Sequence, residues 1–405
     1  MTSGELPLAG ITAVALEHAV AGPLASRHLA DLGARVVKLE RPGEGDFARH
    51  YDHVVNGLAT HFVWLNRGKE SVAVDLKNPD GKQLVRALLS RADVFLHNTA
   101  PGVVERLELD GETLRAANPR LIVVNISGYG PTGPRSHRKA YDMLVQAESG
   151  MVAVTGTPDT PTKTGVPSAD IAAGVYAAMS VLAALVRRER TGQGAVIDVS
   201  MFDAAVEWMG HPLYMQLYGG GQIPRMGLSH AAIAPYDAYT TADGQILIGV
   251  QNDRGWRTLV SEVFGHAEYA DDPRFATNVA RVAHRGECDA LVGAFTREWT
   301  TAGIDDRLAE VGIPAARINT TADVVVHPQL VERDRWRTVG TEAGDISGLL
   351  PPMTFRDVEL PMGRVPALGE HTDQILAELR SDVAGRRCAV QAAECPRGEH
   401  PRCDL

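Results

Sequence analysis

Residues 11–130 alternate short apolar runs with helical stretches, and this alternation constrains the fold more than any other feature of the chain. The apolar runs occupy residues 11–16, 34–40, 71–76, 93–98 and 121–130. Apolar residues recur at helical spacing over 22–33 and 78–92, and an interrupted helical stretch covers 101–119. Runs of this kind are typical of βαβ units with parallel strands. The sequence therefore predicts an α/β fold with a Rossmann-like open parallel sheet.

The rest of the chain predicts a second unit and a return to the first. We expect a helix over 140–150, a strand and loop over 151–165, and a strand followed by a helix over 195–210. Glycine and aromatic residues without periodicity predict a linker and mobile loop from residue 211. Residues 235–320 predict a separate unit that opens with a hairpin turning at Asp243-Gly244. A strand within 312–318 and a final helix over 369–379 follow, and residues 381–405 have the composition of a disordered tail.

Composition and charge argue against nucleic-acid-binding, membrane and metal-binding classes of protein. The net charge of −10 disfavours a nucleic-acid partner. We find no apolar run of the roughly 18–20 residues that span a bilayer, and no signal peptide, so we expect no membrane partner. Cys288 stands alone, and three cysteines lie in the last residues at a spacing that fits no common zinc site. This pattern is typical of a reducing cytoplasm and predicts no metal.

Polar and basic residues follow the predicted strands. Ligands of open α/β sheets bind beyond the carboxyl ends of the strands, where these loops meet. Each cation alone is more simply explained as a solvated surface charge, but their clustering on an acidic protein predicts an anionic, phosphorylated ligand. The residues in these loops are His18, Val20, Ala21, Arg41, Lys77, Asn98, Thr99, Arg106 and Lys139.

The stretch GYGPTG at 128–133 matches a dinucleotide fingerprint by letter only. That fingerprint requires a helix to open at the loop, so that its N-terminus faces the pyrophosphate. Pro131 and Pro134 predict an extended loop instead. We therefore interpret it as a tight turn.

Asp170 stands at the start of a long, small-residue helix that ends before Gly192. The simpler interpretation makes Asp170 the N-cap of this helix. The alternative is a carboxylate held ionised by the positive helix end, in a hollow left by Ala169, Ala172 and Gly174, where it acts as a nucleophile. The spacing does not decide between them.

Taken together, these segments resemble the family III CoA-transferases, which include formyl-CoA and carnitine CoA-transferases and related racemases. The matching pieces are AVAGPLASRHLADLGARVVKLERPGEGDFAR, LNRGKESVAVDLKNPDG, NTAPGVVERL, ISGYGPTGP, KAYDMLVQAESG, the Asp170 segment and RERTGQGAVIDVSMFDA. They cover most of residues 10–205. As a set at these spacings they are specific, whereas any one alone is weak.

The resemblance implies an interlocked homodimer. It divides each chain into a large Rossmann-like CoA-binding domain over 1–222, a small α+β domain over 223–325 and a return segment over 326–380. It implies no cofactor, because the coenzyme A thioester is itself a substrate together with a small carboxylic acid. The residues that match the family's CoA contacts are Val20, Ala21, Arg41, Val74, Asp75, Leu76, Lys77, Asn98, Thr99, Ala100, Arg106, Lys139, Ala140, Tyr141 and Asp142.

Asp170 matches the family's catalytic aspartate, which forms an anhydride with the acyl group and then a thioester with CoA. Asp142 matches an acid that orients this nucleophile. The related racemases carry a histidine where this chain has Tyr141, which favours transfer over racemisation of a 2-methylacyl-CoA. A non-catalytic CoA-binding protein is a third hypothesis, and an intact Asp170 argues against it.

The segment around residues 211–239 is similar to transferases that act on C4–C5 dicarboxylic acids such as mesaconate, itaconate, citramalate or succinate. Transfer within one dicarboxylic molecule is included in this hypothesis. A distal carboxylate requires a cation, and Arg49, Arg225 and His230 are the candidates. Gly219 to Gly221 match a glycine loop that covers the site in formyl-CoA transferases, although 225–230 fits that place equally well.

Overall fold

The computed structural model describes residues 5–381, which form two compact units. Within the described residues the first comprises 5–149, 165–208 and 334–381, and the second comprises Gly150–Thr164 and Met209–Arg333. Each unit has its own buried core. The tail with its three cysteines lies outside the described residues, and the domain boundaries implied by the resemblance stay predictions.

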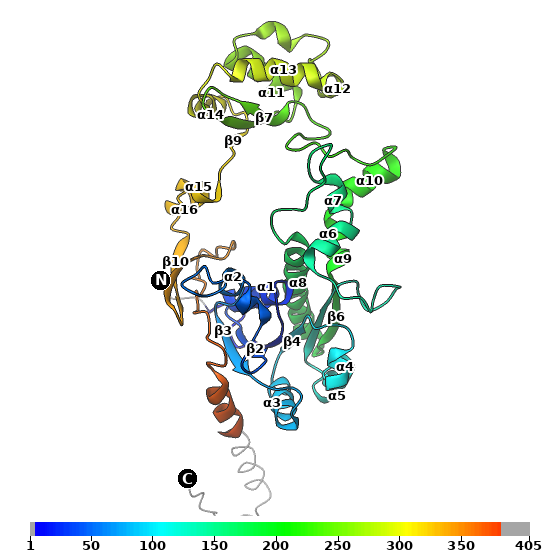
Figure 1. Ribbon diagram of the computed structural model, residues 1–405, viewed down its shortest axis with the longest axis vertical. Coiled ribbons are helices and arrows are strands. Elements are labelled where there is room, and N and C mark those ends of the chain that lie inside the picture. Colours follow the sequence, from blue (N-terminus) through cyan, green and yellow to red (C-terminus); the bar gives the residue numbers. More distant parts are fainter. Residues whose placement is uncertain (1–4, 382–405) are drawn as a thin grey trace, which may run out of the picture. The chain divides into compact units, whose positions relative to one another are not determined.

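A six-stranded parallel sheet organises the first unit, in the order β3-β2-β1-β4-β5-β6 (Figure 1). Its strands are β1 (Thr12–Leu16), β2 (Arg35–Glu40), β3 (Lys69–Ala73), β4 (Val94–His97), β5 (Ile122–Ser127) and β6 (Ala195–Ser200). β1, β2, β4 and β5 are mostly buried, as expected for a parallel sheet covered on both faces. The predicted α/β parallel sheet is confirmed. Its winding reverses between β1 and β4, which is where such sheets bind ligands.

Helices connect these strands. They are α1 (Ala21–Asp31), η1 (Phe47–His50), α2 (Thr60–Leu65), α3 (Pro79–Leu89), α4 (Val103–Leu107), α5 (Gly111–Ala117), α6 (Asp142–Glu148), α8 (Ser168–Thr191) and α9 (Met201–Trp208). An antiparallel pair, β10 (Trp336–Thr341) and β11 (Gly344–Leu349), precedes a helix over residues 372–381. Ile375 and Leu379 of that helix join the core cluster of the sheet and α3.

The long helix α8 crosses α1 closely because its first turns carry small residues. A Cβ added at Gly174 would lie 2.8 Å from the carbonyl oxygen of Ala21 and 3.0 Å from Cβ of Leu24. Ala173 and Ala177 are fully buried on the same helix. The crossing therefore brings the N-terminal turn of α1 beside the first turn of α8, which contains Asp170.

α8 is also the one helix among residues 5–381 that is long and apolar enough to cross a membrane, by length and composition. The expectation that no segment meets this criterion was wrong. The finding is weak evidence for a membrane, because a core helix of a soluble protein passes the same test. Here α8 packs against α1, α9 and the strands β5 and β6.

The second unit contains a three-stranded antiparallel sheet with helices around it. Its elements are α7 (Met151–Val154), α10 (Gly210–Tyr218), β7 (Tyr236–Thr240), β8 (Gln245–Gly249), α11 (Asp253–Thr258), η2 (Leu259–Val263), η3 (Ala267–Ala270), α12 (Asn278–Ala283), α13 (Arg285–Thr296), α14 (Thr301–Glu310), β9 (Ala315–Arg317), α15 (Thr321–Val325) and α16 (Pro328–Val331). The predicted hairpin is confirmed, with the N–H of Thr241 donating to the carbonyl of Gly244 across the turn.

Two local predictions in this unit were wrong. Residues 151–154 form the helix α7 rather than a strand, because Gly150 takes a left-handed φ of 86° and starts a new helical turn. Four apolar residues are too few for periodicity to separate the two states. Residues 210–218 form α10 rather than a linker.

Candidate functional site

Two of the cavities at the carboxyl ends of the parallel strands share a lining residue. The larger, of about 560 Å³, lies beyond β1, β2 and β3, and the smaller, of about 200 Å³, lies beyond β4 and β5. His18 lines both, so the two cavities adjoin. The sequence-predicted residues that line the larger cavity are Arg41, Val74, Asp75, Leu76, Lys77 and Arg106. Those that line the smaller are Ala21, Asn98, Thr99, Ala100, Lys139, Ala140, Tyr141 and Asp170.

Two predicted contacts line neither cavity. Val20 is the N-cap of α1 and is buried against Leu24 and Leu65. Asp142 begins α6 and accepts hydrogen bonds from two backbone N–H groups at the start of α8.

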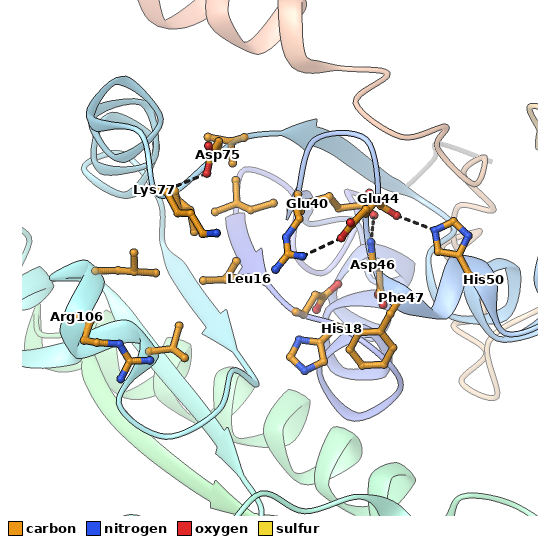
Figure 2. A pocket seen from close by; sticks show the side chains of 18 residues that line it. Leu16, His18, Glu40, Glu44, Asp46, Phe47, His50, Asp75, Lys77 and Arg106 are labelled. Atoms are coloured by element: carbon orange, nitrogen blue, oxygen red, sulfur yellow. Dashed lines mark hydrogen bonds and ion pairs between the residues drawn. The ribbon is translucent and has the colours of Figure 1, made fainter.

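The larger cavity combines apolar walls with cations from three elements (Figure 2). Leu16, Leu39 and Leu107 supply apolar surface. Lys77 follows β3, and Arg106 reaches in from α4. Arg41 follows β2 and pairs with exposed Glu44 at 2.8 Å, a surface ion pair that a phosphate competes with easily. This lining suits an anionic ligand with an apolar body.

The loop between β1 and α1 is held by side chains from other elements. Asn98, after β4, accepts from the N–H of His18 at 3.0 Å and donates to its carbonyl at 2.8 Å. Asp46 accepts from the N–H of Ala19 at 3.1 Å. Ala19 has a φ of 62°, in the left-handed region where a side chain is strained. The loop thus has one enforced conformation, which presents the N-terminus of α1 to the smaller cavity.

Asp170 is the third residue of α8, and the N-cap interpretation was wrong. The N-cap position belongs to Pro167, whose side chain makes no capping bond. Instead Oδ1 of Asp142 accepts from the N–H groups of Ala169 at 2.8 Å and Asp170 at 3.2 Å. Gln146 donates to the other oxygen of Asp142 at 2.6 Å. The helix is therefore capped from α6, which leaves the carboxylate of Asp170 to face the cavity.

The pKa of Asp170 is raised, whereas the positive end of a helix was expected to lower it. Burial, and after it the carboxylate of Asp142, raise the pKa of Asp170 to about 7 against the opposing effect of a hydrogen bond from the backbone N–H of Ala21. Burial and a like charge thus outweigh the positive ends of α1 and α8. Near neutral pH the carboxyl group of Asp170 is about half ionised, rather than held ionised as the sequence suggested.

Tyr51, which sequence reasoning missed, lies near this carboxylate. Burial raises the pKa of Tyr51 to about 12, with further contributions from Asp46, Asp170 and Tyr141. Its ring contacts those of Phe47 and His61, at centroid distances of 5.8 and 5.4 Å. The phenol stays neutral and can donate a hydrogen bond. An aromatic residue after a 3-10 turn carries no distinctive signal in a single sequence.

The three candidate cations for a distal carboxylate have other partners. Arg49 donates from Nε and Nη2 to the two oxygens of Glu40, and its guanidinium lies 3.6 Å from the ring centroid of Phe62. Arg225, in the second unit, donates to the carbonyls of Ala153, Thr157 and Pro158. His230 stacks on Tyr236 and accepts at Nδ1 from the N–H of Ala232, so the neutral ring carries its proton at Nε2. The structure gives no support to Arg49 or Arg225 as free cations.

The rejection of the dinucleotide fingerprint is confirmed. Gly130 and Gly133 take left-handed φ values of 82° and 86° in a loop, and the next helix, α6, begins only at Asp142. Within residues 5–381 no cluster of histidine, cysteine and acidic side chains could hold a metal ion.

Known proteins resemble this chain over nearly its whole length. Residues 8–372 match the model of CoA-transferase family III. The chain is 36% identical over 391 residues to succinate–glutarate CoA-transferase of Agrobacterium fabrum, covering 94% of this chain and 98% of that protein. It is 34% identical over 380 residues to succinyl-CoA–D-citramalate CoA-transferase of Chloroflexus aurantiacus, covering 92% and 94%.

The fold has a solved counterpart of similar size. The crystal structure of a CAIB/BAIF family protein from Brucella suis is 39% identical, with a TM-score of 0.82, and the match covers 93% of this chain and 100% of that one.

Proposed function

Because the chain belongs to CoA-transferase family III and is a CoA-transferase, we propose that it moves coenzyme A between short dicarboxylic acids with Asp170 as the nucleophile. The observation that carries the proposal is the position of this carboxylate. It lines the small cavity that adjoins the larger, cation-lined one, and the N–H of Ala21 bonds to it. Relatives named for succinate, glutarate and citramalate support the substrate class.

The two adjoining cavities suit the two ends of an acyl-CoA. The phosphorylated nucleotide end would lie in the larger cavity beside Arg41, Lys77 and Arg106. The pantetheine arm would pass His18, which lines both cavities, and carry the thioester to Asp170. Charged phosphates bind guanidinium and ammonium groups strongly, whereas a thioester needs no charge partner. In this arrangement the charged phosphates lie beside the three cations, and the uncharged thioester lies beside Asp170.

The reaction then follows from the nucleophile. An oxygen of the Asp170 carboxylate attacks the thioester carbonyl, and the C–S bond of the tetrahedral adduct then breaks. CoA leaves as a thiolate, and the acyl group stays on Asp170 as a mixed anhydride. The thiolate attacks Cγ of Asp170 and expels the first acid as a carboxylate, which leaves an aspartyl-CoA thioester. The second acid attacks the same Cγ, and the steps run in reverse until CoA is transferred and Asp170 is free. Charge and atoms balance at each step, and water must be excluded to protect the anhydride.

The N–H of Ala21 has a second role in this scheme. Whenever Cγ of Asp170 is attacked, negative charge develops on the oxygen of that carbonyl. A backbone donor already bonded to the carboxylate is placed to stabilise this oxyanion, a contribution of about 3–4 kcal/mol in characterised oxyanion holes. The strained loop at Ala19 is the structural reason that this donor is fixed in position.

We also propose a cytoplasmic homodimer that uses no cofactor and no metal. One stripe of α8 leaves Val175, Met179 and Val186 exposed, which fits burial against a second copy. Sedimentation velocity at micromolar concentration tests the proposal, and a monomer there would contradict it.

Chemical trapping tests the role of Asp170. The protein is incubated with succinyl-CoA, quenched with hydroxylamine and digested for mass spectrometry. We expect a hydroxamate at Asp170, none in Asp170→Asn, and unchanged labelling in the control Asp373→Asn at an exposed acid of the final helix. A label elsewhere, or transfer to glutarate undiminished in Asp170→Asn, would refute the proposal. Deuterium exchange into the α-carbon of a 2-methylacyl-CoA would indicate a racemase instead.

A further inference from the structure

A cluster of buried charges lies beneath the loop that connects β1 to α1. Glu17, Lys38, Glu40, Asp46 and Lys69 are each at most 4% exposed, and Arg49 is close beside them. The three carboxylates and three cations cancel in formal charge. Buried ion pairs of this kind seldom add stability, since apolar residues of similar size often do as well. Stability alone therefore gives a weak reason for so many charges in one place.

The cluster binds the backbone of the loop and of the first turn of α1 as well as its own members. Nζ of Lys38 donates to the carbonyl of Glu17 at 3.3 Å, and Nζ of Lys69 donates to the carbonyl of Pro23 at 2.9 Å. Asp46 is the member that reaches the strained residue. Its Oδ1 accepts from the N–H of Ala19 at 3.1 Å, and its Oδ2 accepts from Lys38 at 2.9 Å.

Asp46 is itself fixed in place. Its own N–H donates to Oε2 of Glu40 at 2.9 Å, and its Oδ1 also accepts from the N–H of Ala48 at 2.9 Å, where it caps η1. Burial opposes ionisation of Asp46, but Lys38 and the N–H groups hold its pKa below the ordinary value. An ionised, immobile acceptor is thus available for one loop N–H. Ala21, whose N–H reaches Asp170, is two residues further along the loop.

We infer that Asp46 is a positioning residue for the transfer reaction: its Oδ1 holds Ala19 in the left-handed conformation that turns the N–H of Ala21 toward Asp170. The inference rests on the proposed function of Asp170. It assigns to Asp46 a geometric role, carried by its oxygen, rather than an electrostatic one carried by its charge. Those two roles predict opposite changes in the ionisation of Asp170.

The other groups that face Asp170 are known. Asp142 approaches from α6, and Tyr51 from the segment after η1. The other titratable or charged residues that line the same cavity are His18, Arg138, Lys139 and Tyr141. Removal of the negative charge of Asp46, with all else unchanged, lowers the pKa of any nearby carboxyl. Loss of the Ala21 hydrogen bond raises the pKa of Asp170, because that bond favours the ionised form. The sign of the shift therefore separates the two roles.

Two substitutions divide charge from geometry. Asp46→Asn removes the charge but keeps an Oδ1 acceptor for Ala19, whereas Asp46→Glu keeps the charge and moves the acceptor by one methylene. The matched control is Asp31→Glu, which makes the same extension at a different buried carboxylate. Asp31 lies outside the loop and pairs with Arg67 at an N–O distance of 2.8 Å. Circular dichroism melts show whether each variant is folded. The measurement is the pH profile of kcat/KM with succinyl-CoA and glutarate.

For Asp46→Glu we expect kcat to fall about tenfold to 100-fold, and the acid limb of the profile to shift to higher pH, as a misplaced group requires. In Asp46→Asn the NH₂ group no longer accepts from Lys38, but Oδ1 still accepts from Ala19. We therefore expect a smaller loss of activity than in Asp46→Glu and an acid limb at or below the wild-type position. Asp31→Glu should lower the melting temperature without moving the limb.

A wild-type limb in folded Asp46→Glu would overturn the inference, as would an Asp46→Asn variant as impaired as Asp46→Glu. If Asp46→Glu does not fold, the test rests on Asp46→Asn. A shift of the acid limb of its pH profile to higher pH would overturn the inference, and retained activity without such a shift would support it. Asp170→Asn is measured beside them. Full activity in that variant would refute the proposed function itself, whatever the Asp46 variants do.

Discussion

Replacing Asp142 with asparagine tests whether this neighbouring charge sets the basicity of Asp170. Asparagine keeps the shape of the side chain, and its Oδ1 can still accept from the N–H groups of Ala169 and Asp170. Gln146, which now donates to Asp142, can rotate its amide to accept from the new NH₂ group. The helix cap is therefore retained, and the change removes one negative charge.

The magnitude follows from the closeness of the two carboxyl groups. Oδ1 of Asp142 is 3.2 Å from the amide nitrogen of Asp170, which places the two carboxylates on the order of 6 Å apart. Two unit charges at about 6 Å interact by about 0.7 kcal/mol in water and about 2.8 kcal/mol at an effective dielectric constant of about 20. That range corresponds to about 0.5–2 pKa units, and we take about 1 unit as the expected shift.

The assay is the pH dependence of kcat/KM for CoA transfer from succinyl-CoA to glutarate. The acid limb of this profile reports the free enzyme, so the wild type should rise through a pKa of about 7 and Asp142→Asn through about 6. At pH 6 the ionised fraction of Asp170 would then increase from about one-tenth to about one-half, which is about fivefold relative to each plateau. An acid limb that stays at the wild-type position in a folded variant would refute the reasoning.

Three further predictions follow from the same geometry. Asp170→Asn should raise the free energy of unfolding, measured by urea denaturation, by about 2–4 kcal/mol at pH 8 and change it little at pH 4. The reason is that the pKa of the wild-type carboxyl is raised in the folded state, so its contribution to stability is present below about pH 3.9 and lost as pH rises through about 7. Gly174→Ala should lower kcat about tenfold or more, because the Cβ of the new alanine would press on the carbonyl of Ala21 and displace α1 from α8. An undiminished kcat would show that the crossing tolerates the methyl group. Lys77→Ala should raise KM for succinyl-CoA about tenfold and leave KM for glutarate unchanged, and a reversed pattern would place the nucleotide elsewhere.

The sequence predicted the parallel sheet because its signals are local. Each strand is a short apolar run, each connecting helix has its own periodicity, and five repeats leave few alternatives to a parallel sheet. The predictions failed where a single residue sets the outcome. Gly150 starts a helical turn through a left-handed φ, and α10 forms in a segment whose glycines suggested a linker.

The candidate site was predictable in position but not in its inner contacts. Strand-end loops converge by topology, so Lys77 and Arg106 could be placed at one cavity from sequence alone. Lys38 and Glu40 carry no distinctive signal in the sequence, and only the folded sheet buries them beneath the loop. The cap on α8 comes from Asp142, 28 residues before Asp170, and no local pattern reveals such a partner.

The raised pKa of Asp170 has a chemical consequence under the proposed mechanism. The mixed anhydride offers the CoA thiolate two carbonyls, and each attack expels the carboxylate on the other side. Attack on the acyl carbonyl expels Asp170, whose pKa is about 7, and attack on Cγ of Asp170 expels a substrate carboxylate of ordinary, lower pKa. The weaker base is the better leaving group, so the substrate carboxylate is expelled more easily than Asp170. By raising the pKa of Asp170, burial and Asp142 therefore favour attack of the thiolate on Cγ, which forms the aspartyl-CoA thioester. The N–H of Ala21 is placed to stabilise the oxyanion of that attack.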